Sequence, residues 1–316
     1  MIALLDRSAL NVNSEIISRL RKIGERGFDL SKRANARLDR LFAEIRSLRA
    51  SALKQMGDEL YLELDEFLKY EVSWQMGTLN DVAISAGLTT TAPTLRRVRA
   101  AAFSQPFESR LLRDWSKSLE PAEFRRVRWA ISNGVVEGRT TPQITALVNR
   151  ELLTTNRHTT AIVRTATNHT QNAARNAVAL ENAELLKGVQ YVSTLDSKTS
   201  ERCRFLDKQV FPVGEGPRPP QHINCRSTTT MILKRVRTVA GRRESVNGLV
   251  PDDLSYYEWL KKQKSDDLVS EVVGAKNLKA FRSGKLAVKR FNDQSGKLYN
   301  LSDLKKADRS TYKVVG

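Results

Sequence analysis

Apolar residues recur at alternating three- and four-residue steps from Leu30 to Leu68, and the basic residues of this stretch fall largely off that stripe. Such spacing places the apolar side chains on one face of a helix. The pattern predicts a long two-sided helix that starts after the N-cap Asp29 and continues towards Met76, with Gly57 as a potential break. A helix this long rarely packs wholly inside its own domain, so we expect it to pair with a later helix or to dock on a partner.

The middle of the chain predicts more helices, separated by short breaks. The small, polar run at 83–93 indicates a linker. Pro106 and Pro121 stand where helices can begin, and Gly138 is suited to end one. The expected helices are 96–103, 122–136, a segment opened by Thr141 and Pro142, and 157–186.

The expected helix at 157–186 carries an unusual polar face. Its polar residues follow three- and four-residue spacing, which places them on one side of the helix: Arg164, Asn168, Gln171, Asn172 and Arg175. The structural interpretation is that this face supports the segment after it or faces solvent. The alternative is a catalytic face.

Two short runs rich in β-branched and aromatic residues, 189–194 and 227–233, bracket a stretch rich in proline and glycine. This predicts a small sheet with one long loop. Short helices are expected near 256–260 and 268–273, and a strand pair at 286–301. The fold class predicted is a mainly α N-terminal region with long helices, followed by a small α+β C-terminal domain.

The length of 316 residues favours about two domains. The pattern divides the chain into four segments: a long-helix region for partner docking at 1–85, a helical region at 95–188, a small β-containing segment at 189–235, and a basic α+β extension at 236–316.

Positive charge is concentrated towards the C-terminus. The formal net charge is +18, and residues 191–316 hold 25 basic and 14 acidic side chains, a net +11. Such a field favours a polyanion, most simply nucleic acid. No aromatic residue lies between Val236 and Val250, so we expect backbone contact without sequence readout. The densest patch, our candidate for nucleic-acid contact, is Lys234, Arg235, Arg237, Arg242 and Arg243.

The remaining composition predicts an intracellular, soluble protein. No apolar run approaches the roughly 20 residues that span a bilayer, so no membrane partner is expected. The first ten residues lack the charged start of a secretory signal. Only two cysteines are present, which fits a reducing compartment.

Cys203, His222 and Cys225 fall in the long loop segment in the order C, then H-x-x-C. With Asp196 or Asp207 as a fourth ligand they provide the residue types of a zinc site. The usual C-x-x-C knuckle is absent, however, so no metal or cofactor is expected. A Cys203–Cys225 disulfide and two free packed thiols are the alternatives.

A catalytic use of the same segment is the next alternative. A histidine with a carboxylate, such as His222 with Asp196 or Asp207, is the minimum for general acid–base work, and Arg226 is near in sequence. No H-E-x-x-H, phosphate-binding glycine loop or G-x-S-x-G motif accompanies them. Asp196 is typical of a turn and His222 of a residue that fixes a loop. We therefore expect no enzyme and no catalytic residue.

The strings STLDSKTSERCRFLDKQVF and PPQHINCRS, at 193–211 and 219–227, resemble the phage Mu F-like minor head, or head-morphogenesis, proteins. Those proteins carry a pattern like T-x-D-x-R-T-C-x-x-C-x-x-L-D-G, followed by P-P-x-H-x-N-C-R-C. The resemblance covers roughly residues 120 to 305. This chain departs from the pattern at four positions: Lys198 replaces arginine, Ser200 and Ser227 replace cysteines, and Lys208 replaces glycine.

Because two of the four family cysteines are serines here, the resemblance implies that Cys203, His222 and Cys225 are structural residues that hold the loop. It also implies a tailed-phage virion component, located in the head interior at the portal vertex in several copies after assembly in the host cytoplasm. The implied partners are the portal protein, the major capsid or scaffold protein, and double-stranded DNA, with which the protein would be ejected. The rival functions are an injected enzyme, a nuclease or nucleotide-modifying protein that uses Asp196 and His222, and a sequence-independent DNA-binding protein without a virion role.

Overall fold

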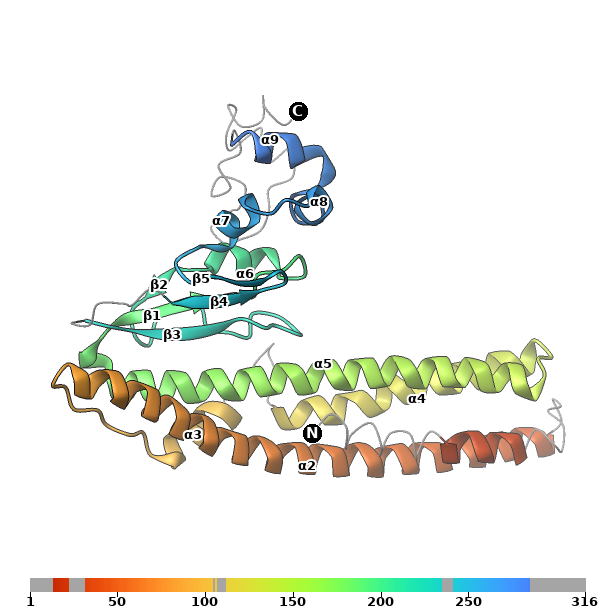
Figure 1. The fold of residues 1–316 in the computed structure, drawn as a ribbon. Helices are drawn as coiled ribbons and strands as arrows, with labels where there is room; N and C mark the ends of the chain where they lie inside the picture. The colour runs from red at the N-terminus through yellow and green to blue at the C-terminus, as the bar shows by residue number, and fades with distance from the viewer. Residues whose placement is uncertain (1–13, 23–31, 105, 107–111, 235–240, 285–316) are drawn as a thin grey trace. The chain divides into compact units, whose positions relative to one another are not determined.

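The computed structural model describes residues 14–22, 32–104, 106, 112–234 and 241–284 (Figure 1). It confirms the predicted fold class, because long helices occupy the N-terminal part and a few antiparallel strands with short helices follow them. In the described part of the chain, no helix combines the length and apolar character that a membrane span requires.

The chain divides into two compact units, which we describe separately. Two long helices each contribute to both units, so the units cut across the four segments expected from the sequence. Unit 1 comprises Met1–Tyr70 and Leu95–Thr170, and unit 2 comprises Glu71–Thr94 and Gln171–Gly316.

The first long helix, α2 (Lys32–Ser85), has 54 residues and is continuous. At 1.5 Å per residue it is roughly 80 Å long. Gly57 does not break it. A glycine inside a helix costs about 1 kcal/mol relative to alanine, and the buried neighbours Leu53, Met56 and Leu60 offset that cost by packing. Residues 88–94 then form the non-helical connection that the sequence predicted.

The next helices are α3 (Leu95–Phe103), α4 (Leu112–Val136) and α5 (Thr141–Glu181). The prediction that a helix begins at Pro121 is wrong, because Pro121 lies inside α4. The prediction of separate helices after residues 141 and 157 is also wrong, since α5 is one helix of 41 residues. No glycine or proline lies within it after Pro142, so nothing in the backbone interrupts it. Gly138, at φ +66°, follows α4 as predicted.

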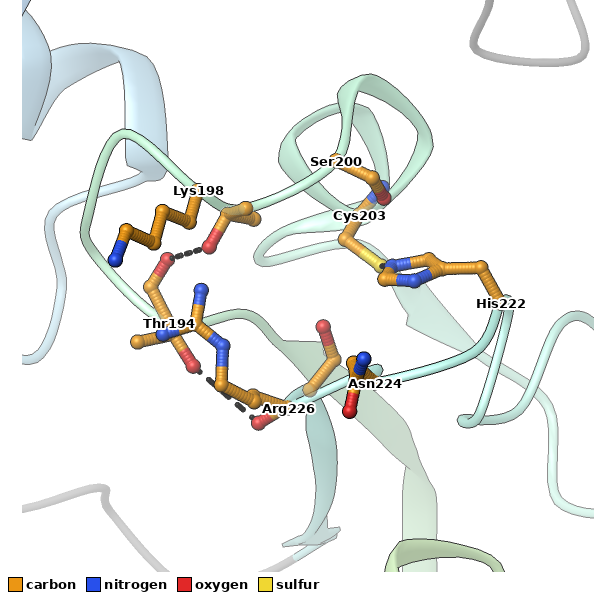
Figure 2. A pocket seen from close by; sticks show the side chains of 9 residues that line it. Thr194, Lys198, Ser200, Cys203, His222, Asn224 and Arg226 are labelled. Carbon is orange, nitrogen blue, oxygen red and sulfur yellow. Dashed lines mark hydrogen bonds between the residues drawn. The ribbon is translucent and has the colours of Figure 1, made fainter. Parts of the chain in front are cut away.

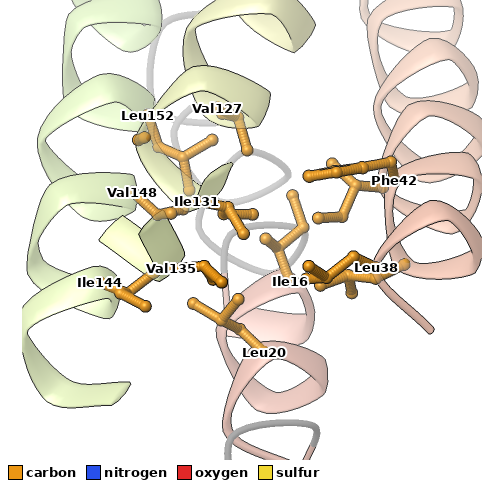
Figure 3. Packing of buried hydrophobic residues seen from close by; sticks show 13 residues of the cluster. Ile16, Leu20, Leu38, Phe42, Val127, Ile131, Val135, Ile144, Val148 and Leu152 are labelled. Carbon is orange, nitrogen blue, oxygen red and sulfur yellow. The ribbon is translucent and has the colours of Figure 1, made fainter. Parts of the chain in front are cut away.

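Unit 1 is held together by two apolar clusters. The larger joins residues 14–22 to α2, α4 and α5, and Figure 3 shows Ile16 and Leu20 between Leu38 on α2 and Val135 on α4. The smaller joins Leu53, Met56, Leu60 and Leu64 of α2 to Ile162, Val163 and Ala166 of α5. The long helix thus pairs with later helices, one of the two outcomes expected for it.

Unit 2 contains a three-stranded antiparallel sheet in the order β2-β1-β3 (Figure 1). β1 (Leu186–Val192) and β3 (Thr228–Leu233) correspond to the two predicted strands, and β2 (Val210–Phe211) adds an edge. A second hairpin, β4 (Arg242–Ser245) with β5 (Gly248–Pro251), was not predicted. The remaining elements are η1 (Ala183–Leu185), α6 (Glu201–Leu206), α7 (Tyr256–Lys261), α8 (Asp266–Val273), η2 (Ala275–Asn277) and α9 (Leu278–Arg282). The strand pair expected at 286–301 lies outside the described residues.

Polar side chains attach the sheet of unit 2 to its helical part. Arg175 on α5 donates from Nε to Glu71 at 2.9 Å and from Nη1 to the Thr228 hydroxyl at 2.6 Å and the Thr229 carbonyl at 2.9 Å. This residue of the polar face therefore supports β3, as the structural interpretation proposed. The buried Asn182 side chain pairs with both backbone groups of Thr91, at 2.7 and 2.8 Å.

The core of unit 1 generates a stability prediction. Ile131 on α4 is fully buried in the larger cluster. Ile131→Ala should lower the free energy of unfolding by about 2–5 kcal/mol, because it leaves a cavity. Urea denaturation followed by circular dichroism measures this. Val136→Ala on the same helix is the control, since Val136 is 72% exposed, and an equal effect of both variants would contradict the packing described.

Candidate functional site

The loop after β1 is organised by Asp196. Its Oδ1 accepts hydrogen bonds from the backbone amides of Lys198 and Thr199, at 3.0 and 2.9 Å. This is the turn predicted for Asp196. Arg226 donates to both carboxylate oxygens of Asp196. The loop is thereby joined to the residues just before β3.

Asp207 follows α6 and is buried with its partner Arg243 of β4, whose guanidinium lies 3.0 Å from Asp207 Oδ1. Asp207 also accepts hydrogen bonds from the backbone amides of Ser193, at 2.7 Å, and Tyr256, at 2.8 Å. Arg243 donates in addition to the carbonyls of Ser193 and Leu254. One carboxylate thus connects the end of β1, the β4–β5 hairpin and the start of α7.

The fold brings Cys203, His222 and Cys225 together, although the first two lie 19 positions apart in the sequence. Cys203 Sγ lies 3.4 Å from His222 Nε2 and 3.8 Å from Cys225 Sγ. Within the described residues, these three form a group whose ligand atoms all lie within 4.8 Å of one another, and neither Asp196 nor Asp207 belongs to it. Both thiols are buried and His222 is half-buried.

The protonation of this group follows from its contacts. The hydrogen bond between the two thiols lowers the pKa of Cys225, to which His222 also contributes, and raises the pKa of Cys203. Burial raises the pKa of Tyr191, so its phenol stays protonated beside Cys203 Sγ, 3.2 Å away. We call Cys203, His222 and Cys225 the thiol cluster. Its Cys203 sulfur contacts both the Tyr191 hydroxyl and the His222 imidazole.

A small pocket of about 10 Å³ opens beside the cluster, and Figure 2 shows the His222 ring next to the Cys203 sulfur at its edge. A volume of this order holds about one water molecule. Ser200 and Ser227, the two positions where the family pattern has cysteines, both line it. Ser200 also caps α6, since its hydroxyl accepts a hydrogen bond from the Cys203 amide.

The structure separates the five basic residues predicted to contact nucleic acid. Lys234 and Arg242 are exposed. The Arg243 side chain is buried and donates hydrogen bonds to Asp207 and to two carbonyls, so it is not accessible to a phosphate. Arg235 and Arg237 lie outside the described residues.

Several residues of the site were not singled out from the sequence. Tyr191, Ser193 and Tyr256 provide contacts to Cys203 or Asp207. Tyr191 sits within a predicted strand and Tyr256 within a predicted helix, so their apolar patterning predicted burial without revealing the partner. Lys208 stands in the left-handed region at φ +67°, which explains physically why a glycine suits that position in the family pattern.

The buried ion pair generates a second prediction. Asp207→Ala should lower the free energy of unfolding by about 3–5 kcal/mol, because it leaves Arg243 buried without its counterion. The matched control is Asp266→Ala, which removes an exposed carboxylate from Arg282 and should shift the urea midpoint little. Equal midpoint shifts in the two variants would refute the role assigned to Asp207.

Comparison with known proteins finds a family match that includes this region of the chain. Residues 125–230 match the family model described as Phage Mu protein F like protein. No curated protein and no solved structure matches. The matched segment runs from α4 to β3 and includes Asp196, Asp207 and the thiol cluster. The resemblance predicted from the sequence for roughly residues 120 to 305 is confirmed for residues 125–230, over which the chain is similar to the phage Mu protein F like family.

Proposed function

We propose that this chain is a structural minor head protein of a tailed phage that acts in head assembly at the portal vertex and contacts packaged DNA. The observation that carries the proposal is the family match over residues 125–230, which indicates a phage head-related protein of the virion. A non-catalytic role is supported by the two candidate carboxylates, because Asp196 holds a turn and Asp207 a buried ion pair.

Contact with DNA is supported by the charge distribution. Residues 191–316 carry a net charge of +11, from 25 basic and 14 acidic side chains. Lys234 and Arg242 lie exposed at the end of β3 and the start of β4. Cations of this kind neutralise phosphates and release counterions, which favours binding without sequence preference. We propose double-stranded DNA as the polyanion and its backbone as the contact.

Docking at the portal is supported by α2. The apolar stripe of α2 packs inside unit 1 from Leu38 to Leu64. Leu62 and Tyr70 on the same helix are nevertheless 67% and 64% exposed. Exposed large apolar side chains are typical of a protein–protein contact when they form a contiguous patch, and Tyr61 beside Leu62 is 42% exposed. We propose that this part of α2 contacts the portal protein.

The DNA proposal predicts a salt-dependent affinity. The full-length chain should bind a fluorescent duplex with a logarithmic affinity that falls linearly with the logarithm of salt concentration. The double variant Lys234→Gln/Arg242→Gln should reduce the magnitude of that slope by about 1 to 2, because up to two phosphate contacts are lost. Fluorescence anisotropy across a salt series measures both.

The control for this experiment is Lys54→Gln/Lys69→Gln, which removes the same charge from α2. Its slope should equal that of the unchanged protein. An affinity of the unchanged protein that is constant in salt, or equal slopes for the two double variants, would reject the proposed contact.

The portal proposal predicts that Leu62→Lys/Tyr70→Lys reduces the copies per phage head several-fold while the circular dichroism spectrum is unchanged. Charges on the exposed face should oppose an apolar contact without disturbing the core. Quantitative immunoblotting of purified heads measures incorporation. Trp129→Lys/Val136→Lys places the same charges on exposed apolar positions of α4 and should incorporate normally. Normal incorporation of the α2 variant would count against this docking face.

A further inference from the structure

We propose that Cys203, His222 and Cys225 bind a zinc ion. The three side chains come from α6 and from the loop before β3, and their ligand atoms lie within 4.8 Å of one another. Two thiols and an imidazole are the donors that zinc takes in proteins. The sequence alone did not favour a metal because the C-x-x-C spacing is absent, but the fold supplies the proximity that spacing usually provides.

The distances match the edges of a zinc tetrahedron. With Zn–S of about 2.3 Å and Zn–N of about 2.0–2.1 Å, two sulfurs lie about 3.8 Å apart and a sulfur and a nitrogen about 3.5 Å apart. Cys203 Sγ is 3.8 Å from Cys225 Sγ and 3.4 Å from His222 Nε2. An ion placed between these atoms therefore meets its preferred bond lengths with little movement of Cys203 relative to its two neighbours.

The imidazole is held in the orientation that a zinc ligand requires. His222 Nδ1 lies 2.8 Å from the Ile223 carbonyl, to which it donates its hydrogen. The other nitrogen, Nε2, then carries the lone pair and faces Cys203. A hydrogen bond from the second ring nitrogen to a carbonyl is the usual support of a zinc-bound histidine. Tyr191 supports Cys203 similarly, because its phenol lies 3.2 Å from Sγ.

The adjoining pocket can hold the fourth ligand of a tetrahedral zinc ion. It has room for about one water molecule and is lined by the hydroxyl-bearing Ser200 and Ser227. Three protein ligands and one water make a complete tetrahedral shell. The ion would join α6 to the stretch between β2 and β3, which has no regular strand or helix at residues 212–227.

A disulfide is the competing use of the same cysteines. It requires the sulfurs to approach from 3.8 Å to about 2.05 Å. A disulfide also does not explain why His222 Nε2 faces Cys203. Zinc uses all three groups at their observed spacing, which is why we favour it.

The test uses the full-length chain, purified with a reductant and loaded with zinc alone. Mass spectrometry of metals should find about one zinc per chain, and cobalt substitution should give a thiolate-to-cobalt charge-transfer band. Cys203→Ser, Cys225→Ser and His222→Gln should each weaken zinc binding at least tenfold, as measured by competition with a chromophoric chelator. Ser227→Cys should tighten binding at least tenfold, because it adds a third thiolate beside the pocket.

The control Ser270→Cys adds a thiol on α8, outside the cluster, and should leave the affinity unchanged. A full-length chain that takes up no zinc and gives no cobalt band under reducing conditions overturns the proposal. So does equal tightening by Ser227→Cys and Ser270→Cys. The disulfide is tested with protein isolated without reductant. If its two cysteines react with a thiol reagent only after reduction, and the reduced protein still binds no zinc, the pair is assigned to a disulfide instead.

Discussion

The buried ion pair between Asp207 and Arg243 is the interaction on which the β-containing part of unit 2 depends. A carboxylate removed from water is tolerated only when its oxygens are saturated by donors. Asp207 obtains them from Arg243 and from the amides of Ser193 and Tyr256. Arg243 belongs to β4, Ser193 directly follows β1 and Tyr256 begins α7. Satisfying one charge therefore fixes the relative position of three elements.

The spacing of apolar residues was sufficient to predict the helices but not where each helix begins and ends. The apolar stripe from Leu30 onward predicted α2, and its burial against α4 and α5 explains why Gly57 could not interrupt it. The prediction at Pro121 was wrong because a proline is favoured in the first turn of a helix, whereas in the interior it removes a hydrogen bond and costs roughly 3 kcal/mol. Here Val127, Ala130 and Ile131 bury the following turns. The packing that decides such cases is not visible in local sequence.

The site was predicted in its residue types but not in its distances. Cys203 and His222 are separated by a loop whose path depends on where β2 and β3 pair with β1. The same holds for Asp207 and Arg243, 36 positions apart, each of which was assigned to a different role from the sequence. Charged residues that pair across such separations have no periodic signature. Arg243 therefore looked like part of a basic patch although its side chain is buried.

The internal pairing of arginines changes how the basic charge should be interpreted. Arg175, Arg226 and Arg243 each face a carboxylate. The pairs of Arg175 and Arg243 are largely buried, whereas Arg226 stays exposed beside its carboxylate. The net charge and its long-range field persist in all three cases, while the number of cations able to touch phosphate falls. Formal charge thus overestimates the salt slope of any nucleic-acid contact. Zinc bound by two thiolates would add less net charge than the ion itself carries, because thiol protons leave as the ion enters. Metal loading and electrostatic attraction to a polyanion are therefore separable properties of the same unit.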